Sequence, residues 1–520
     1  MTSQFNSYMK HLHQDLPAGI VVFLVALPLC LGVALASGAP LFSGIIAGLV
    51  GGILVSWASG SQLSVSGPAA GLTVIVFEAI ETLGGFGGFL LSVVLAGGLQ
   101  ILLGFLKAGV IGAFFPASVI KGMLAAIGLI LIIKQTPHAT GYDTSFEGDE
   151  SYMQESAESS FFELSEALEA FTPGVTIVSA VALLILIVWD SGFIKQFKLL
   201  KLIPGPLLAV IWGVSFNALA LHFAPDMIIG EKHLVSLPEL GSTANFINQL
   251  RLPDFSYFSN PKIYSVAVTI AIIASLETLL SIEAVDKLDP HKRVAPTNRE
   301  LKAQGLGNMV SGLMGGLPIT AVIVRSSANI NAGGQTRIAS FFHGVLLLVS
   351  VLFFAKYLNM IPLACLAAIL LQTGYKLAKP ALFVEFYRKG WNQFAPFAIT
   401  VVAILFTDLL LGIAIGMACG FFFVLKANFH AAITLTQHGP HYLLRLHKDV
   451  SFLNKALLRK YLDQVPDDSD LLIDGTKAQF IDLDIMETIA DFLQSATDRN
   501  VAVEIQGFSV SCETSSSSGH

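Results

Sequence analysis

Charged side chains are scarce in this sequence. Asp, Glu, Lys and Arg make up 13% of its 520 residues, while 54% are apolar and the mean hydropathy is +0.70. A water-soluble fold of this length needs a larger charged surface. The composition therefore excludes a cytosolic or secreted enzyme and indicates a protein embedded in a lipid bilayer.

Cysteine is rarer still. The four cysteines, Cys30, Cys365, Cys419 and Cys512, show neither paired nor metal-ligand spacing, so we expect no disulfide framework and no zinc site. No apolar run contains an H-x-x-x-H pair, and neither a G-x-S-x-G motif nor a P-loop occurs. These absences disfavour an intramembrane enzyme or a primary pump, and neither a cofactor nor a nucleic-acid partner is expected.

Long apolar runs dominate what is present. Most are close to the twenty or so residues that cross a hydrocarbon core about 30 Å thick. They predict fourteen spans in a transmembrane domain at residues 16–427, after a cytoplasmic N-terminal segment at residues 1–15. The predicted spans are 16–36, 41–58, 64–82, 88–106, 112–134, 173–190, 203–223, 262–284, 304–316, 317–332, 338–356, 360–376, 394–410 and 411–427.

The charged loops predict the orientation. Lys195, Lys198 and Lys201 follow the sixth span, and a second basic cluster at residues 287–302 follows the eighth, so both loops should be cytoplasmic. Residues 136–172 carry nine acidic residues and no Lys or Arg, which predicts an acidic extracytoplasmic loop. With an even number of spans, both termini are cytoplasmic, and we expect a multi-pass protein of the inner (cytoplasmic) membrane.

Two spans are unusual because each opens with an extended, proline-containing piece before a short helical stretch. The pieces are Ser64–Pro68 in the third span and Gly315–Pro318 in the tenth. Matched segments interrupted by Gly and Pro are typical of broken helices in transporters. The prolines lie 250 residues apart, and the same offset lays the first span over the eighth. We predict inverted seven-span repeats at 16–223 and 262–427; the alternative is two unrelated proline kinks.

The two predicted half-helices define a candidate substrate site. If their N-termini meet near the bilayer midplane, free backbone N–H groups and positive dipole ends converge and make an anion site. Small side chains would allow a ligand to approach the backbone, although such residues also serve close helix packing in membranes. The predicted substrate-binding residues are Ser66, Ala69, Ala70, Gly71, Thr320, Ala321, Val322 and Arg325.

Arg325 and Glu277 are the two intramembrane charges that we expect to act at this site. A guanidinium at bilayer depth is costly unless it faces partners or water, so Arg325 either complements the anion or pairs with a carboxylate to join the two halves. Glu277, in the eighth span, is the obvious carboxylate and also the candidate for coupling to H⁺ or Na⁺. Thr278 and Ser281 add oxygen ligands, which leaves Na⁺ at Glu277 and Ser281 as an option without a firm metal site.

Beyond Lys426 the composition is that of a soluble domain. Helical patterns at 454–464 and 484–496 alternate with strand patterns at 470–474 and 501–505, which favours a small α/β domain at residues 445–508. The Ser-rich tail at residues 509–520 is expected to be disordered.

Five motifs resemble the SulP family (solute carrier family 26). They are Asp15-Leu-Pro-Ala-Gly, Ser66-Gly-Pro-Ala-Ala-Gly71, Val119-Ile-Lys-Gly-Met123, Ile203-Pro-Gly-Pro206 and the stretch from Gly315 to Arg325. The resemblance covers residues 15–505. It implies seven-plus-seven inverted repeats in which a core domain moves against a gate domain by an elevator-like mechanism. It also implies a homodimer and a cytoplasmic STAS domain, which the segment from Phe452 to Ile505 resembles through its motif from Asp474 to Asp482.

Family substrates are inorganic oxyanions and halides, among them sulfate, bicarbonate and chloride. The sequence around Glu277 and Thr297-Asn-Arg-Glu-Leu301 looks most like bacterial members associated with carbonic anhydrase, so bicarbonate leads slightly over sulfate. Sodium-coupled members usually carry Asp where this chain has Glu277 and Thr where it has Ile323, which weakens Na⁺ coupling. Leu483 replaces the serine that some relatives phosphorylate, so phospho-regulation is not expected there.

We therefore predict a polytopic α-helical membrane protein that is a secondary active transporter of a small inorganic oxyanion, coupled to H⁺ or Na⁺. An anion channel or a chloride/bicarbonate exchanger is the main alternative, because the same electropositive cavity would conduct if both gates opened together. A nucleobase permease shares the fold by resemblance but commonly uses a second acidic residue in the tenth span, which here has Arg325 and no acid. A non-transporting scaffold acting through its STAS-like domain is the remaining alternative.

Overall fold

The computed structural model describes residues 2–110, 115–141, 172–191, 194–196, 203–238, 249–407, 409–447 and 449–508. Most of the predicted acidic loop at residues 136–172 lies outside the described residues. So do Lys198 and Lys201, two of the three lysines of the basic loop after the sixth predicted span, and the predicted Ser-rich tail. The chain divides into two compact units, Met1–Gly416 and Met417–His520.

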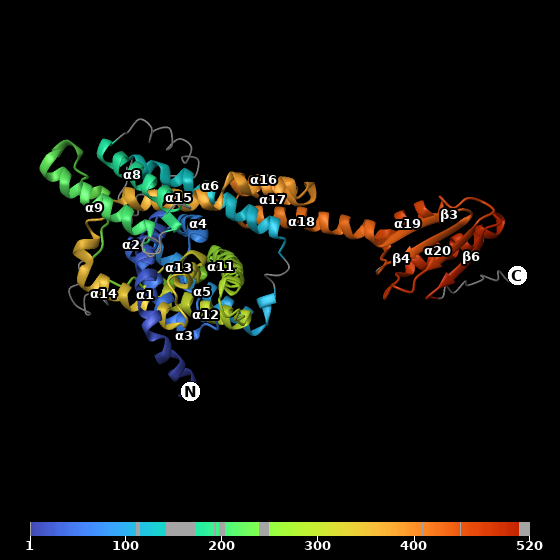
Figure 1. Ribbon diagram of the computed structural model, residues 1–520, viewed down its shortest axis with the longest axis horizontal. Coiled ribbons are helices and arrows are strands. Elements are labelled where there is room, and N and C mark those ends of the chain that lie inside the picture. Colours follow the sequence, from blue (N-terminus) through green and yellow to red (C-terminus); the bar gives the residue numbers. More distant parts are fainter. Residues whose placement is uncertain are drawn as a thin grey trace. The chain divides into compact units, whose positions relative to one another are not determined.

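The first unit is helical (Figure 1). Seven of the described helices are long and apolar enough to cross a membrane, and three shorter apolar helices accompany them. The helices overlap the predicted spans, although α1 begins at Thr2 and α12 at Thr297, before the spans predicted from residues 16 and 304, and the short helix α16 is not predicted. The main helices are α1 (Thr2–Ala36), α2 (Leu41–Val50) with the π-helical turn η1 (Gly51–Val55) and α3 (Ser56–Ala58), α4 (Thr73–Leu83), α5 (Phe86–Phe105), α6 (Ala117–Thr140), α8 (Pro173–Trp189), α9 (Gly205–Phe223), α11 (Pro261–Leu288), α12 (Thr297–Met314), α13 (Ile323–Asn331), α14 (Ile338–Leu358), α15 (Leu363–Leu377), α16 (Pro380–Arg388), α17 (Trp391–Phe406) and α18 (Leu409–Ala431), whose residues are divided between the units.

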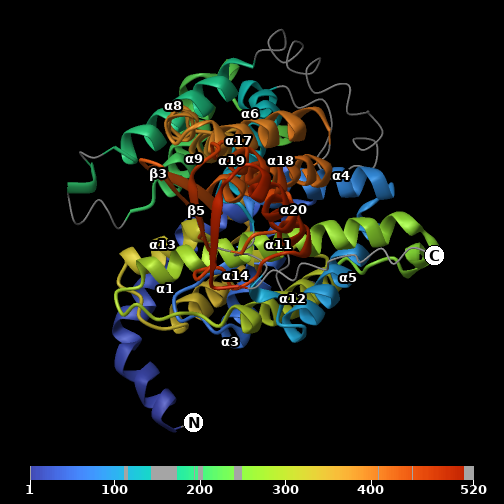
Figure 2. The same ribbon diagram turned by 90° about the vertical axis from the view of Figure 1, so that its right-hand side faces the viewer.

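The helices of the first unit form two groups, which Figures 1 and 2 both separate. In the first group α5 packs on α11 and α12, and α1 packs on α14; in the second, α6 packs on α15 and α17, and α8 packs on α15. Glycine permits the closest of these contacts. An ideal Cβ on Gly97 of α5 would lie 2.5 Å from the Gly305 carbonyl oxygen of α12, and one on Gly128 of α6 would lie 2.6 Å from the Gly374 carbonyl oxygen of α15.

Two extended segments meet inside the first group. β1 (Ser66–Pro68) pairs antiparallel with β2 (Ile319–Ala321), with Ser66 opposite Ala321 and Pro68 opposite Ile319. Each segment leads into a helix, β1 through the 3₁₀ turn η2 (Ala70–Leu72) into α4 and β2 into α13. The backbone therefore has the predicted form of an extended piece followed by a half-helix in both places.

The start of the second half-helix corrects one detail of the prediction. Thr320 and Ala321 lie in β2 and Val322 is the N-cap of α13, so none of the three belongs to the first helical turn. The reason is that the Val322 N–H donates to the Val65 carbonyl oxygen (3.0 Å), which extends the strand pairing by one residue before the helix begins.

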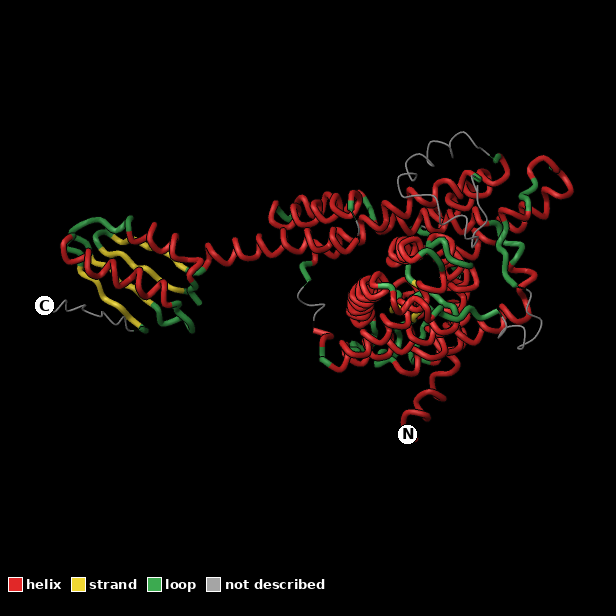
Figure 3. The backbone as a smooth tube through the Cα atoms, turned by 180° about the vertical axis from the view of Figure 1, so that it is seen from behind, coloured by secondary structure: helices red, strands yellow, loops and turns green. Residues whose placement is uncertain are grey.

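The second unit contains a four-stranded sheet with the order β3-β4-β5-β6 (Figure 3). β3 (Ile433–His438) and β4 (His441–Leu446) are antiparallel, while β5 (Asp470–Asp474) and β6 (Ala502–Gln506) continue in parallel. The crossover helices α19 (Lys455–Leu462) and α20 (Leu483–Asp498) contact each other, and their apolar side chains bury alternate residues of β4 and β5. The predicted small α/β region is confirmed, but the range 445–508 omits β3 and most of β4, because β3 buries little beyond Ile433 and carries a weak apolar signal.

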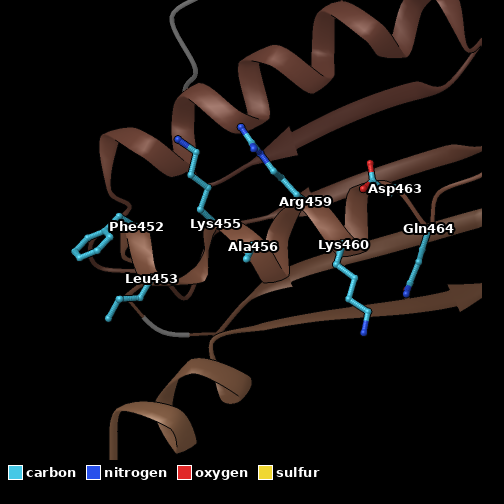
Figure 4. A pocket seen from close by; sticks show the side chains of 8 residues that line it. All are labelled: Phe452, Leu453, Lys455, Ala456, Arg459, Lys460, Asp463 and Gln464. Atoms are coloured by element: carbon cyan, nitrogen blue, oxygen red, sulfur yellow. The ribbon is translucent and has the colours of Figure 1, made fainter. Parts of the chain in front are cut away.

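A shallow hollow follows α19 on the surface of the second unit (Figure 4). Phe452 and Leu453 lie at one end of it, and basic side chains lie along the helix. Lys455 Nζ is 2.7 Å from Asp484 Oδ1 at the start of α20, so part of this basic face joins the two helices rather than remaining free for a ligand.

Asp474 provides a test of how β5 is stabilised. Its carboxylate accepts hydrogen bonds from the Thr476 hydroxyl (2.6 Å) and N–H (3.0 Å) and from Arg445 Nε (3.0 Å), and these bonds lower the pKa of Asp474 to about 2. Because the folded pKa lies below that of an unfolded Asp, about 3.9, the stabilisation is complete above that value and is lost as the pH falls toward 2.

We therefore expect Asp474→Asn to make the second unit of the full chain several-fold more sensitive to pepsin at pH 4, with a much smaller difference from wild type at pH 2. Asp491→Asn, at an exposed position of α20, is the matched control and should behave as wild type at both pH values. Equal sensitivity of Asp474→Asn and wild type at pH 4 would show that these hydrogen bonds do not stabilise the unit.

Candidate functional site

Glu277 of α11 lies at the N-terminus of α4. The Gly71 backbone N–H donates a hydrogen bond to its carboxylate, and an ideal Cβ on Gly71 would lie 2.7 Å from Oε1 and 2.9 Å from Oε2. Only glycine allows this approach. Oε2 is shielded from solvent and has no hydrogen-bond partner among the described residues. A carboxylate therefore lies where the positive end of the first half-helix was predicted to receive a substrate anion.

Arg325 of α13 is completely buried and holds the β1 segment. Its Nη2 donates to the Pro68 carbonyl oxygen (3.1 Å), and an ideal Cβ on Gly67 would lie 2.0 Å from Nη1, so only glycine leaves room for the guanidinium. Nε and Nη1 have no hydrogen-bond partner in the described part of the chain.

No ion pair between Arg325 and Glu277 occurs among the described residues, so the predicted alternative in which the two join the halves as a pair is wrong. The two groups approach the broken segments separately, Arg325 at Pro68 and Glu277 at Gly71. The guanidinium bonds to the backbone instead, because Gly67 and Gly48 leave space for it beside β1.

The other predicted residues gather around the paired segments. The Ser66 hydroxyl accepts a hydrogen bond from Gln304 Nε2 (2.7 Å), and the Thr278 hydroxyl accepts one from the Ala321 N–H (3.4 Å). The Thr320 hydroxyl is buried and donates to the Ala321 carbonyl oxygen (3.3 Å). Ala69 is buried at the N-cap of η2, and Ala70 contacts α6 and α15. Ser281, one turn beyond Glu277, is buried near this group.

Buried amides support the broken segments, and the sequence interpretation missed them. Asn308 Nδ2 donates to Gln100 Oε1 (2.6 Å) and to the Ile319 carbonyl oxygen (3.1 Å), while its Oδ1 accepts the Ile319 N–H. Asn329 Nδ2 donates to the Leu63 carbonyl oxygen (3.0 Å). Amide side chains within apolar runs are the sequence signal that would have identified them, because backbone groups freed from a helix need partners inside a membrane.

His343 of α14 is a second residue that the sequence interpretation missed. It is completely buried, and neither ring nitrogen has a hydrogen-bond partner within the described ranges. An ideal Cβ on Gly52 would lie 2.9 Å from Nδ1, so the π-helical turn η1 leaves room for the ring.

A cavity of about 500 Å³ separates α13 from the second group of helices. Val324, Ser327, Ala328 and Asn331 of α13 line it, at the spacing of one helix face, whereas Arg325 lies outside that face and is buried. The far wall comes from α8, α9 and α15 and includes an ion pair between Asp190 Oδ2 and Lys376 Nζ (3.2 Å). Arg325 does not line this cavity.

Hydroxyls and one guanidinium lie at the two broken segments, and such groups bind anions at helix termini. Among the residues that the structure describes, no group of three or more His, Cys, Asp or Glu side chains could hold a metal ion.

The first unit combines membrane-length helices with two paired extended segments, a polar centre and an adjacent cavity. This combination defines a polytopic helical membrane transporter. The model of the Sulfate permease family matches residues 12–418, so the chain belongs to that family of inorganic anion transporters. The resemblance drawn from the five motifs is confirmed, as is the class of transporter rather than enzyme.

Curated relatives include both sulfate and bicarbonate transporters. The chain is 28% identical over 454 residues to the putative sulfate transporter YvdB of Bacillus subtilis, covering 86% of this chain and 80% of that protein. It is 27% identical over 376 residues to the bicarbonate transporter BicA of Picosynechococcus, covering 71% of this chain and 62% of that protein.

Two solved structures share the fold. The transmembrane domain of a cyanobacterial BicA has a TM-score of 0.64 at 23% identity and covers 79% of this chain and 97% of that chain. The structure of SLC26A9 has a TM-score of 0.77 at 16% identity and covers 96% of this chain and 85% of that chain, so its similarity extends into the C-terminal α/β region.

Proposed function

We propose that the protein is a secondary active transporter that moves a small inorganic oxyanion by alternating access, with bicarbonate first and sulfate second. The observation that carries the proposal is the pairing of β1 with β2, which brings the starts of α4 and α13, Arg325 and Glu277 into one place. Both candidate substrates appear in the names of relatives, BicA and YvdB.

The proposal includes fourteen spans arranged as two inverted seven-span repeats. The contact of α1 with α14 then corresponds to that of α11 with α5, and the contact of α6 with α17 corresponds to that of α15 with α8. The first helix group is the core domain and the second the gate domain, and the cavity between α13 and the gate is the path to one side of the membrane. By the positive-inside rule that side is the cytoplasm, with both termini on it.

Glu277 is proposed to couple anion movement to a cation. As a carboxylate it accepts the Gly71 N–H and places a negative charge at the start of α4, where a second negative charge is disfavoured. A proton or Na⁺ on Glu277 removes this repulsion, so cation and anion bind together. Thr278 and Ser281 are the hydroxyls available to a Na⁺, although Thr278 already accepts the Ala321 N–H.

The family resemblance adds two proposals about partners. The protein forms a homodimer in the membrane, and it is functionally associated with carbonic anhydrase when bicarbonate is the substrate. The C-terminal α/β unit is proposed to be a cytoplasmic STAS-like domain that regulates transport.

The test is uptake of labelled bicarbonate and of labelled sulfate into liposomes containing the purified protein, with and without imposed Na⁺ and H⁺ gradients. We expect saturable bicarbonate uptake that one gradient accelerates at least tenfold. Uptake of sulfate alone would contradict the order of substrates. Non-saturable flux of either anion, without dependence on any gradient, would identify a channel instead.

A further inference from the structure

The short helix α16 lies where the chain reaches a membrane surface. It connects α15 to α17, which overlap the predicted spans 360–376 and 394–410, so its nine residues fall between the end of one span and the start of the next. Two phenylalanines attach one face of α16 to α17. The Phe386 ring stacks on the Phe397 ring with centroids 4.7 Å apart, and the Phe383 ring meets Phe397 edge-on at 5.0 Å. One face of α16 is therefore fixed to the second helix group (Figure 1).

Three cations gather at the C-terminal end of α16. Arg388 and Lys389 are exposed there, and Lys121 of α6 is exposed beside them although it is far away in the sequence. A close helix contact brings α6 to this place, because an ideal Cβ on Gly122 would lie 2.7 Å from the Phe397 carbonyl oxygen of α17. The packing of α6 on α17 thus completes a basic surface that no single segment of the chain contains.

Glu385 is the single acidic residue of α16, and two of these cations act on it. The hydrogen bond from Lys389 Nζ (2.5 Å) and the charge of Lys389 lower the pKa of Glu385, and the charge of Lys121 lowers it further. Lys389 Nζ also lies 4.8 Å from the centroid of the Phe386 ring. An ammonium group has three N–H donors, so these contacts still leave donors for an anion. Three cations against one carboxylate give the surface a net positive charge.

Aromatic side chains flank the cations. Tyr387 and Trp391 are each 66% exposed, although both rings contact Phe394, with centroids 5.5 and 5.8 Å away. Val384, one turn before Arg388, is 49% exposed. Membrane proteins place Trp and Tyr together with Lys and Arg at the level of the lipid headgroups, where the ring borders the hydrocarbon and its polar end reaches water. The α16 surface therefore presents cationic and apolar groups side by side, as amphipathic helices at a membrane surface do.

We propose that the α16 surface, formed by Lys121, Arg388, Lys389, Tyr387 and Trp391, binds the headgroup of an anionic phospholipid such as phosphatidylglycerol. The phosphodiester accepts charge-assisted hydrogen bonds from the guanidinium and ammonium groups. The acyl chains cover the exposed apolar side chains, which a small soluble anion would leave in water. By the positive-inside rule this lipid belongs to the cytoplasmic leaflet. It anchors the second helix group in the membrane while the first moves; the anchoring rests on the proposed function, whereas lipid binding does not.

The test measures which lipid lies next to Trp391. The full-length protein is reconstituted in phosphatidylcholine liposomes that contain a small fraction of brominated phosphatidylglycerol or of brominated phosphatidylcholine, and quenching of tryptophan fluorescence reports the lipid in contact with the rings. We expect the anionic lipid to bind about tenfold more tightly than the zwitterionic one. Trp391→Phe should remove this excess quenching. Excess quenching that persists in Trp391→Phe would place the lipid elsewhere and overturn the proposal.

Charge variants decide whether these cations provide the preference. Lys121→Gln, Arg388→Gln and Lys389→Gln combined should reduce the preference for the anionic lipid to about one. Glu385→Gln should instead raise it about threefold, because the competing carboxylate is lost. A gain of binding does not arise from misfolding. An unchanged preference in the triple variant, or a lower one in Glu385→Gln, would contradict the assignment.

A basic pair elsewhere on the first unit is the matched control. Lys287 of α11 pairs with Glu283 (2.5 Å), and Lys292 Nζ donates to the Lys287 carbonyl oxygen (2.7 Å). Lys287→Gln combined with Lys292→Gln should leave the excess quenching at Trp391 unchanged. A loss as large as that of the triple variant would mean that the preference follows the total charge of the protein, and the α16 surface would have no specific role.

Two other occupants would be recognised in the same experiments. Reversal of the excess quenching by soluble glycerol 3-phosphate would identify a site for a free phosphate ester. A wild-type dimer that becomes a single chain in the triple variant, with the lipid preference retained, would show that a second copy covers the surface. Either result overturns the lipid proposal. The quenching needs no transported substrate, so a protein that moves no anion would contradict the proposed function and leave the lipid result standing.

Discussion

Arg325→Ala is expected to raise the Kd of the transported anion at least 100-fold, which corresponds to about 3 kcal/mol of lost binding free energy. The substitution removes the guanidinium that lies against β1 and takes away the hydrogen bond that Nη2 donates to the Pro68 carbonyl oxygen. Because a large buried side chain is also lost, we expect the free energy of unfolding to fall by about 3 kcal/mol. The measurements are anion binding by isothermal titration calorimetry and thermal unfolding of the purified protein.

Two variants distinguish the charge of Arg325 from its packing. Arg325→Lys keeps the charge without the planar fork and should recover part of the affinity. Arg337→Ala removes another buried guanidinium, whose Nη1 donates to the Trp57 carbonyl oxygen (3.1 Å) away from the paired segments. It should lower stability without changing anion affinity. Wild-type affinity in Arg325→Ala would show that Arg325 serves the backbone alone.

Glu277→Gln is expected to abolish acceleration of uptake by a H⁺ or Na⁺ gradient, which lowers the driven rate at least tenfold, and to make the anion Kd independent of pH and of Na⁺, close to the Kd of the wild type with its cation bound. The amide oxygen can still accept the Gly71 N–H, so the start of α4 keeps its partner. The amide carries no negative charge and binds no proton, so cation and anion are no longer linked. Initial rates in liposomes with and without each gradient provide the measurement.

Glu300→Gln is the matched control for this experiment. Glu300 of α12 is also buried. Its Oε1 accepts hydrogen bonds from the Ser59 hydroxyl, the Gly60 N–H (2.6 Å) and the Ser61 N–H (3.1 Å), a set of donors that does not include Gly71. It should lower thermal stability and leave gradient dependence intact. Retention of gradient dependence in Glu277→Gln would remove Glu277 from the coupling mechanism.

Much of the site region could be predicted because its signals are local. Glycine and proline occur together around Pro68 and Pro318 and disfavour a regular helix, so the extended pieces before α4 and α13 could be predicted from neighbouring residues. The exact start of α13 could not be predicted, because the hydrogen bond that delays it joins Val322 to Val65, more than 250 residues earlier. The same applies to the amides: Asn308 is visible in the sequence as a polar residue, but its partners are not.

The sequence by itself determined the membrane class, the positions of the helices, the broken segments, the small α/β region and the family, since hydropathy, helix-breaking residues and motifs are properties of neighbouring residues. Only the tertiary structure decided which groups meet. It placed Glu277 against Gly71 and Arg325 against Pro68 rather than against each other, and it brought Lys134 of α6 over Phe77 of α4. The reason is that these contacts depend on how closely helix backbones approach, and glycines such as Gly67 and Gly71 set that distance only once the helices are packed.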